Sequence, residues 1–439
     1  MKKIAVTIGL AAIGATSIHA AYAPDKSGDK TWSVSATLRG FYDDNYGATG
    51  VDPRGGFGGE LTPQFQIVKP LNQTELGLRY IYALFYYETR DHLNQNAYDQ
   101  NHWVNLWLDH VFNEKWETKL SDSITVTQDP QLLSAGSAAS TFPFRADGNY
   151  IYNNATASLH TDWTRRLGTV LTYNNQLYTF DQTGSQSADN IKAGQTPSYA
   201  GQFDRMDQAL TADLQWHAST ETIWGVGYTF DWVGFSGNEP ISYYPAKDQV
   251  FYSDYRNSYT HTFFLSYQHN LTDSVKFTAM AGGQLNDNYN DISQKSTPVS
   301  PYADISATYL YKPGSSLQFG FTHSLNTSYL PVLNGTTANT NNGSISEYQE
   351  SSTVYLNINH QITPKLLALV GGRYQNASFQ EGPFASQSEN YYSAVANLSY
   401  SFTRHFSFEL GYNYTQVESV QVGTSYRRNQ YSVAITGSY

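Results

Sequence analysis

The chain of 439 residues is 14% charged and 15% aromatic, and it carries a formal net charge of −11 at pH 7. Soluble globular domains are typically about a quarter charged, so an ordinary set of two or three soluble domains is not indicated. The acidic balance excludes the basic surface that nucleic-acid binding needs. The absence of cysteine excludes a disulfide framework and a lipid-modified N-terminal cysteine.

The N-terminus has the layout of an export signal. Met1-Lys2-Lys3 is basic, Ile4 to Ile18 is a run of apolar and small residues, and Ala21-Tyr22-Ala23 offers small-residue cleavage positions. The apolar run is shorter than the roughly 20 residues that a membrane-spanning helix needs. We therefore predict a secretory signal peptide over residues 1–23 and a single mature unit over residues 24–439. The stretch before the first predicted strand is too short for a plug domain.

From Trp32 onward, apolar side chains recur at every second position in one segment after another, most clearly over residues 76–86, 224–232 and 406–414. A period of two indicates strands with one apolar face and one polar face. Segments of roughly 10–14 residues can cross a bilayer when tilted. The pattern predicts an all-β fold, a single transmembrane antiparallel β-barrel of about 18 strands. A count of 16 is also compatible, because residues 149–160 and 348–360 alternate poorly.

The connections between these segments alternate between two kinds. Short ones, such as residues 113–115, 218–220 and 403–405, carry residues typical of tight turns. Long ones, rich in Gly, Asn, Asp, Ser and Pro, cover residues 43–57, 129–148, 181–204, 236–257 and 328–347. Short periplasmic turns and long extracellular loops are typical of a transmembrane barrel. A soluble all-β protein and a β-propeller are the alternatives, and neither explains the one-sided long loops.

Charged and polar side chains occupy the positions between the apolar ones. If the apolar positions face lipid, these alternate positions line the interior, where charges of both signs can meet water. An 18-stranded barrel is too wide for its side chains to fill, so we expect a water-filled channel. The candidate pore-lining residues are Arg39, Arg79, Glu117, Lys119, Arg145, Asp213, Lys276, Asp304, Arg373 and Glu409.

The long loop over residues 129–148 is unusually apolar, since it contains Leu132, Leu133, Phe142 and Phe144. Loops in water seldom carry so much apolar surface. One interpretation is that this loop folds into the barrel and narrows the pore, with Arg145 near the constriction. Packing over the barrel mouth, or contact with a neighbouring protomer, explains the composition equally well.

The last segment ends on an aromatic residue. Its apolar positions alternate with small polar ones up to the terminus. Outer-membrane barrels commonly close with such a strand, which the barrel insertion machinery reads. Tryptophans also lie near the predicted strand ends, where aromatic girdles anchor a barrel to both headgroup layers. The predicted C-terminal insertion signal consists of Tyr431, Val433, Ile435, Gly437 and Tyr439.

Short motifs add a family resemblance. Gly40-Phe-Tyr-Asp-Asp-Asn45 ends the first predicted strand, Leu61-Thr-Pro-Gln-Phe65 opens the second, and an aromatic hairpin runs from Trp103 to Thr127. With these features the mature chain resembles bacterial outer-membrane β-barrel porins, and more narrowly the putative beta-barrel porin 2 group. The resemblance implies passive diffusion or, in some relatives, association with exopolysaccharide export. It implies no catalytic residue.

The expected function is an outer-membrane porin through which small hydrophilic solutes, such as sugars or cations, diffuse passively. Acidic residues outnumber basic ones in most long loops, which favours cations at the mouth.

An exopolysaccharide-export component and a structural or adhesin barrel that acts through its loops are the alternatives. We find no catalytic, metal-binding or cofactor-binding motif. The expected partners are outer-membrane lipid, lipopolysaccharide and the insertion machinery, and the sequence is compatible with a homo-oligomer.

Overall fold

The computed structural model of this chain describes residues 31–93, 95–129, 145, 148–181, 185, 187–290, 297–328, 346–380, 384–420 and 424–439. The predicted signal peptide and most of the apolar loop over residues 129–148 lie outside the described residues.

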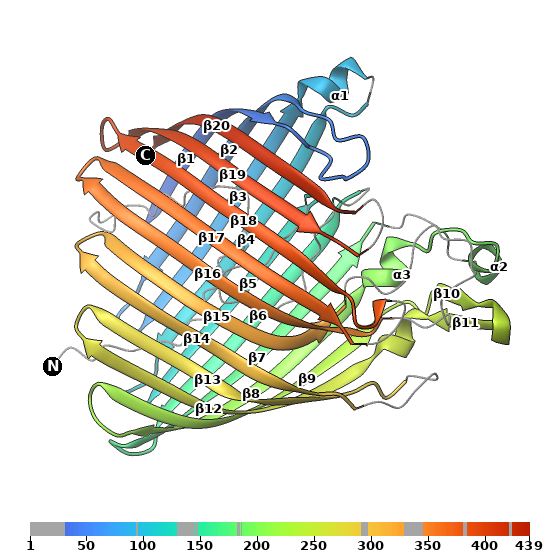
Figure 1. Cartoon of the computed structure of the whole chain (residues 1–439). Helices are drawn as coiled ribbons and strands as arrows, with labels where there is room; N and C mark the ends of the chain where they lie inside the picture. Colours follow the sequence, from blue (N-terminus) through green and yellow to red (C-terminus); the bar gives the residue numbers. More distant parts are fainter. Residues whose placement is uncertain are drawn as a thin grey trace.

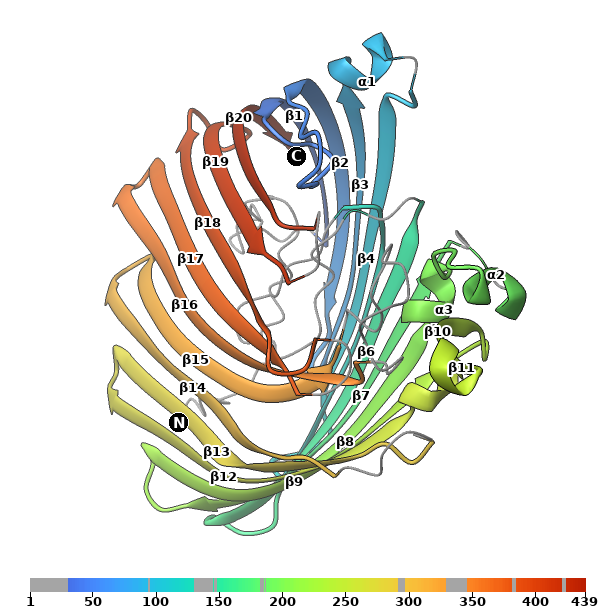
Figure 2. The ribbon, with the colours of Figure 1, turned by 45° about the vertical axis from the view of Figure 1, so that its right-hand side comes forward.

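Eighteen strands of the described residues form one antiparallel sheet that closes on itself (Figures 1 and 2). Each strand pairs with its neighbours in sequence, and β1 pairs with β20 to close the barrel. The strands are β1 (Trp32–Asp43), β2 (Gly56–Pro70), β3 (Thr74–Tyr87), β4 (Tyr98–Val111), β5 (Trp116–Thr127), β6 (Tyr150–Asp162), β7 (Leu167–Phe180), β8 (Arg205–His217), β9 (Thr222–Phe235), β12 (Ser258–Thr272), β13 (Val275–Asp287), β14 (Val299–Lys312), β15 (Ser315–Thr327), β16 (Tyr348–Thr363), β17 (Leu366–Phe379), β18 (Ser388–Ser401), β19 (Phe406–Glu418) and β20 (Tyr426–Ser438).

The predicted barrel and its count of about 18 strands are confirmed. The two poorly alternating segments are strands β6 and β16. Short turns gather at one rim of the barrel and the long connections at the other, on the left and right of Figure 1. Both ends of the described chain therefore lie at the short-turn rim, where Val34 and Tyr439 exchange backbone hydrogen bonds of 3.2 and 2.9 Å.

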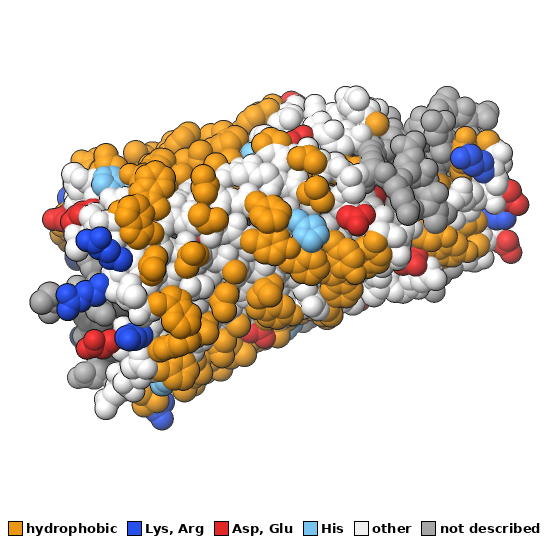
Figure 3. Space-filling view, turned by 90° about the horizontal axis from the view of Figure 1, so that it is seen from below, with side chains coloured by type: hydrophobic (Ala, Val, Ile, Leu, Met, Phe, Trp, Pro, Cys, Tyr) orange, Lys and Arg blue, Asp and Glu red, His pale blue; other side chains and the backbone are white. Residues whose placement is uncertain are grey.

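The outer face of the wall is apolar because alternate side chains of each strand point away from the interior. Leu38, Val226, Phe263 and Leu265 are each more than 60% exposed. The space-filling view shows hydrophobic side chains over the wall and charged side chains gathered towards its two ends (Figure 3). Trp32, Trp163, Trp216 and Trp224 are exposed near the short-turn rim, as a membrane-interface girdle requires.

The seam between the first and last strands explains the aromatic terminus. Tyr431, Val433, Ile435 and Tyr439 of the final segment are exposed on the outer face. The Tyr439 ring lies 5.6 Å from the Trp32 ring, centroid to centroid. On the inner face, the Thr37 and Thr436 hydroxyl oxygens lie 2.8 Å apart. The terminal aromatic side chain therefore packs at the short-turn edge of the seam.

The long connections contain secondary structure that the alternation did not predict. They carry the short helices α1 (Glu88–His92), α2 (Ala188–Lys192) and α3 (Tyr199–Phe203), and the 3-10 turns η1 (Pro245–Lys247) and η2 (Ser253–Arg256). A small hairpin of β10 (Pro240–Tyr244) and β11 (Gln249–Tyr252) stands at the loop rim in Figure 2. Ile241 and Phe251 form its buried cluster. In the described part of the chain, every helix is too short or too polar to cross a bilayer.

Candidate functional site

The inner face of the wall is the candidate functional site. Nine of the ten candidate pore-lining residues lie on strands at inward-facing positions, on β1, β3, β5, β8, β13, β14, β17 and β19. The tenth, Arg145, lies in the connection between β5 and β6. The strand register then decides which of these side chains meet, and the sequence alone could not supply those pairings.

Arg39 joins three strands on the inner face. Its guanidinium donates to Glu60 of β2 at 2.9 Å and to Glu409 of β19 at 3.3 Å. Glu409 and Arg39 both lie directly opposite Ala434 of β20, one on each side. Because alanine is short, the Arg39 side chain can reach across β20. The pair with Glu60 is buried, with side-chain exposures of 6% and 2%.

Arg145 lies in a cluster of charges at the loop rim. It donates to Asp99 of β4 at 2.5 Å and to Asp129, just after β5, at 2.8 Å. Asp99 also accepts two hydrogen bonds from Arg90 of α1. The two carboxylates raise the pKa of Arg145 although its burial lowers it. Arg145 is therefore held as a cation beside the ends of β4 and β5, while the rest of the predicted constriction lies outside the described residues.

Part of the inner face near the loop rim is apolar, which the sequence analysis missed. Phe41, Phe85, Tyr87 and Trp103 lie at inward-facing positions and form one buried cluster with Tyr46 of the first loop. A second buried cluster contains residues from β6 and β7, from α3 and from β17 to β20, together with Ala48 of the first loop. The first loop thus folds towards the interior and packs on the wall. The sequence carried one signal of this apolar inner face, because aromatic residues occupy both odd and even positions of β1, β3 and β4.

Four inward-facing aromatic rings lie flat on glycines of the neighbouring strand. The directly opposed pairs are Phe41 and Gly58, Trp107 and Gly77, Phe264 and Gly227, and Tyr355 and Gly320. A Cβ atom on any of these glycines would come within 2.3 Å of the ring. A ring that covers a cross-strand glycine lies along the sheet. These glycines therefore keep four large side chains close to the wall and away from the middle of the lumen.

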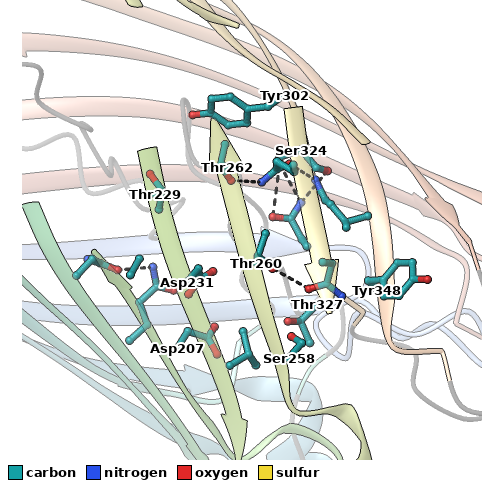
Figure 4. Close-up of a pocket in the computed structure, with 18 of the residues that line it drawn as sticks. Asp207, Thr229, Asp231, Ser258, Thr260, Thr262, Tyr302, Ser324, Thr327 and Tyr348 are labelled. Atoms are coloured by element: carbon teal, nitrogen blue, oxygen red, sulfur yellow. Dashed lines mark hydrogen bonds between the residues drawn. The ribbon is translucent and has the colours of Figure 1, made fainter. Parts of the chain in front are cut away.

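A polar cavity of about 270 Å³ lies against the inner wall between β7 and β16. Hydroxyl groups of Thr229, Ser258, Thr260 and Thr262 line it (Figure 4). Amide side chains and three carboxylates also line it: Asn174, Gln176, Gln284, Asn286, Asn326, Asp207, Asp231 and Glu347. The remaining lining residues are Ser324, Thr327, two tyrosines and three apolar residues, namely Tyr302, Tyr348, Ala209, Val233 and Leu325. Neither lysine nor arginine is among the described residues that line it. Such a surface offers hydrogen bonds to hydroxylated solutes and negative charge to cations.

Three inward carboxylates on this side of the barrel, those of Asp213, Asp231 and Asp304, make no ion pair with a described residue. Asp213 of β8 accepts hydrogen bonds from Gln215 at 2.9 Å and from Ser266 at 3.3 Å. Asp231 of β9 has a buried oxygen with no hydrogen bond. Asp304 of β14 makes no ion pair with a described residue. On the inner face of β8, β9 and β14, therefore, three carboxylates point inward without an ion pair to a described residue.

Asp204 lies outside the wall, in the connection between α3 and β8. It accepts a hydrogen bond from the Phe180 backbone N–H at 2.7 Å. Burial raises the pKa of Asp204 to about 7, and the Glu239 carboxylate also raises it, whereas the Phe180 hydrogen bond lowers it. The folded state therefore binds this proton more tightly than the unfolded chain does.

Stability should consequently fall as pH rises, since the folded pKa of Asp204 lies above its ordinary value of 3.8. The contribution of the bound proton is fully present below about pH 4 and is lost as pH rises through 7. We expect Asp204→Asn, which keeps an acceptor for Phe180, to unfold at a higher temperature than the parent at pH 8 and at the same temperature at pH 4. Thermal unfolding of both proteins at the two pH values tests this, and an equal difference at both values would contradict it.

One family model and several solved structures are similar to this chain. Residues 332–439 match the family model described as Putative beta-barrel porin 2. Among solved structures, the outer membrane protein OpdK of Pseudomonas aeruginosa is 10% identical with a TM-score of 0.42, over 93% of this chain and 99% of that chain. OccAB3 of Acinetobacter baumannii is 11% identical with a TM-score of 0.41, over the same shares. A mutant of the ferric enterobactin receptor PfeA of P. aeruginosa is 9% identical with a TM-score of 0.43, over 92% of this chain and 80% of that chain.

TM-scores in this range do not align individual side chains, so these structures assign no role to any residue here. We find no similar sequence among curated proteins. The closed 18-stranded barrel, its apolar outer face and the family match together identify a porin-like barrel of the outer membrane.

Proposed function

We propose that this barrel is a channel for the passive diffusion of small hydrophilic solutes, with a preference for cations and for neutral hydroxylated molecules such as sugars. The observation that carries the proposal is the inner wall from β8 to β14. Asp213, Asp231 and Asp304 face inward there without an ion pair to a described residue, next to a cavity lined by hydroxyl and amide groups. Rings of carboxylates select cations in water-filled pores.

Two further roles in this proposal concern the ends of the chain. Residues 1–23 would act as the export signal and be removed before the barrel assembles. The outward-facing set Tyr431, Val433, Ile435, Gly437 and Tyr439 would be read by the insertion machinery, and its position at the closing seam supports that role. The nine candidate pore-lining residues on strands would contribute to the channel through the charge that they place on its inner face.

The first test is the conductance of the refolded mature chain in a planar bilayer, with the reversal potential measured across a salt gradient. We expect ohmic steps and a reversal potential that leans towards cations. The triple variant Asp213→Asn, Asp231→Asn and Asp304→Asn should keep the conductance steps and shift the reversal potential towards anion permeation, because three carboxylates that make no ion pair leave the wall.

A loop variant with the same charge change is the matched control. Asp52→Asn, Asp189→Asn and Asp248→Asn remove three exposed carboxylates from the long connections. An equal shift in this control would place the selectivity in the loops instead of the wall. A folded barrel without conductance steps would overturn the channel proposal and favour the export-component or adhesin alternative.

A further inference from the structure

One stretch of the outer face is polar at a level where the wall should be apolar. Asp122 of β5 lies directly opposite Leu106 of β4, which is 43% exposed on the outer face, so both side chains point outward. Leu120, also 43% exposed, precedes Asp122 on the same face of β5, and Ile124 follows it. A carboxylate thus stands between apolar positions on a surface that otherwise meets lipid. Charged groups on the lipid face of a barrel destabilise it most near the bilayer centre.

Polar and small residues continue from Asp122 across the neighbouring strands. Along one row of the sheet, Asp122 lies opposite Ala155 of β6, Ala155 opposite Asn175 of β7, and Asn175 opposite Gln208 of β8. Asn153 donates to one oxygen of Asp122 at 2.5 Å. The other carboxylate oxygen has no hydrogen bond to a described residue. We call the surface of Asp122, Asn153, Ala155, Asn175 and Gln208 the β5–β8 patch.

The opposite side of the barrel has an apolar outer face at corresponding positions. Ala396 of β18 lies opposite Val370 of β17 and Tyr412 of β19. Leu398 on the same strand is exposed. The polarity of the β5–β8 patch is therefore local and does not reflect a general tolerance of the wall for polar groups.

We propose that a second copy of this chain covers the β5–β8 patch and that the protein assembles through it in the membrane. A two-fold axis along the membrane normal near Ala155 sets β5 of one copy against β7 of the other, because the two strands flank β6. Asp122 then faces the strand that carries Tyr173 and Asn175, both with polar side chains able to donate. Tyr173 is 41% exposed on the outer face.

When two copies meet in this way, the acceptor Asp122 of each copy faces hydrogen-bond donors of the other copy. Lipid chains at this level offer no such donors. The small side chains of Ala155 in the patch and of Ala157, two positions further along the same face of β6, allow two walls to approach closely, as small residues do in membrane interfaces. Contact with the second copy removes the carboxylate from lipid and supplies hydrogen-bond donors to it.

The absence of native cysteine permits a direct test. Single-cysteine variants Ala155→Cys and Ala396→Cys, both on outer faces, are reconstituted into lipid vesicles and oxidised. A disulfide needs Cα atoms within about 7 Å, so we expect a covalent dimer with Ala155→Cys and none with Ala396→Cys. In the Ala155→Cys background, Asp122→Leu should abolish the dimer, and Asp122→Asn, which keeps hydrogen bonding, should retain it.

Folding is checked by the gel shift on heating and by urea unfolding, which Asp122→Leu should leave unchanged or improve because the lipid-facing charge is removed. A dimer of equal yield at both cysteines, or no dimer at Ala155→Cys in a folded barrel, would overturn the proposal. A covalent adduct with a different protein, seen only in native membranes, would also overturn it and identify another occupant. None of these readouts depends on conductance, so the proposal stands or falls separately from the proposed channel function.

Discussion

Replacement of Arg39 by methionine is expected to destabilise the barrel by about 3–5 kcal/mol, the range for removing one partner of a buried ion pair. The change removes the Arg39 cation from the Glu60 and Glu409 carboxylates, and both side chains are at least 88% buried. It also removes the side chain that joins β1 to β19 across the closing strand. Urea unfolding of the refolded protein, followed by tryptophan fluorescence, measures the loss.

The exposed pair of Arg54 and Asp52 supplies the control for this prediction. Its side chains are 45% and 72% exposed, and such surface pairs add little to stability. Arg54→Met should therefore leave the unfolding midpoint almost unchanged. If Arg39→Met behaved in the same way, the Arg39 cluster would be too well hydrated to stabilise the seam.

Alanine at Gly227 or Gly320 is expected to lower single-channel conductance. The new Cβ atom would lie 2.1 Å from the Phe264 ring or 2.2 Å from the Tyr355 ring, so the ring must move off the wall. Backbone lies behind these positions, which leaves the lumen as the direction in which the ring can move. Overpacking of this kind also costs about 1–3 kcal/mol of stability.

Gly372→Ala controls for the replacement of a strand glycine alone, because Gly372 shares the outer face of β17 with the exposed Val370 and Tyr374 and a Cβ atom on it would meet nothing within 4 Å. Conductance of the three variants is compared in the same bilayer and salt. A normal conductance for Gly227→Ala and Gly320→Ala, in barrels that remain folded, would show that the rings do not border the conducting path.

For the inner face, the sequence predicted the direction of the charged side chains but not their partners. Alternation placed Arg39, Arg373 and Asp304 on one face of their strands, and the structure has all three pointing inward. It could not show that Arg39 contacts Glu409, because that contact joins residues 370 positions apart and depends on the register of two intervening strand pairs. A shift of one residue in the register of either strand pair would send Arg39 or Glu409 to the lipid face.

The long connections mark a second limit. Their Gly, Asn and Pro content predicted loops correctly at the rim, but composition did not show that Tyr46 and Ala48 of the first loop pack on the inner wall. Nor did it predict the β10–β11 hairpin, whose buried pair of Ile241 and Phe251 is too small to produce a periodic signal. Contacts of this kind depend on which surfaces the closed barrel presents to each loop.

The sequence by itself determined the barrel class, a count of about 18 strands and the inward direction of the charged strand residues that it singled out. It could do so because a strand alternates its side chains with a period of two and a bilayer selects apolar groups for one face only. The tertiary structure decided which inward charges pair, which rings lie on glycines and where polar side chains form a patch on the outer face. Each of these depends on the register between strands, which is set when the whole sheet closes.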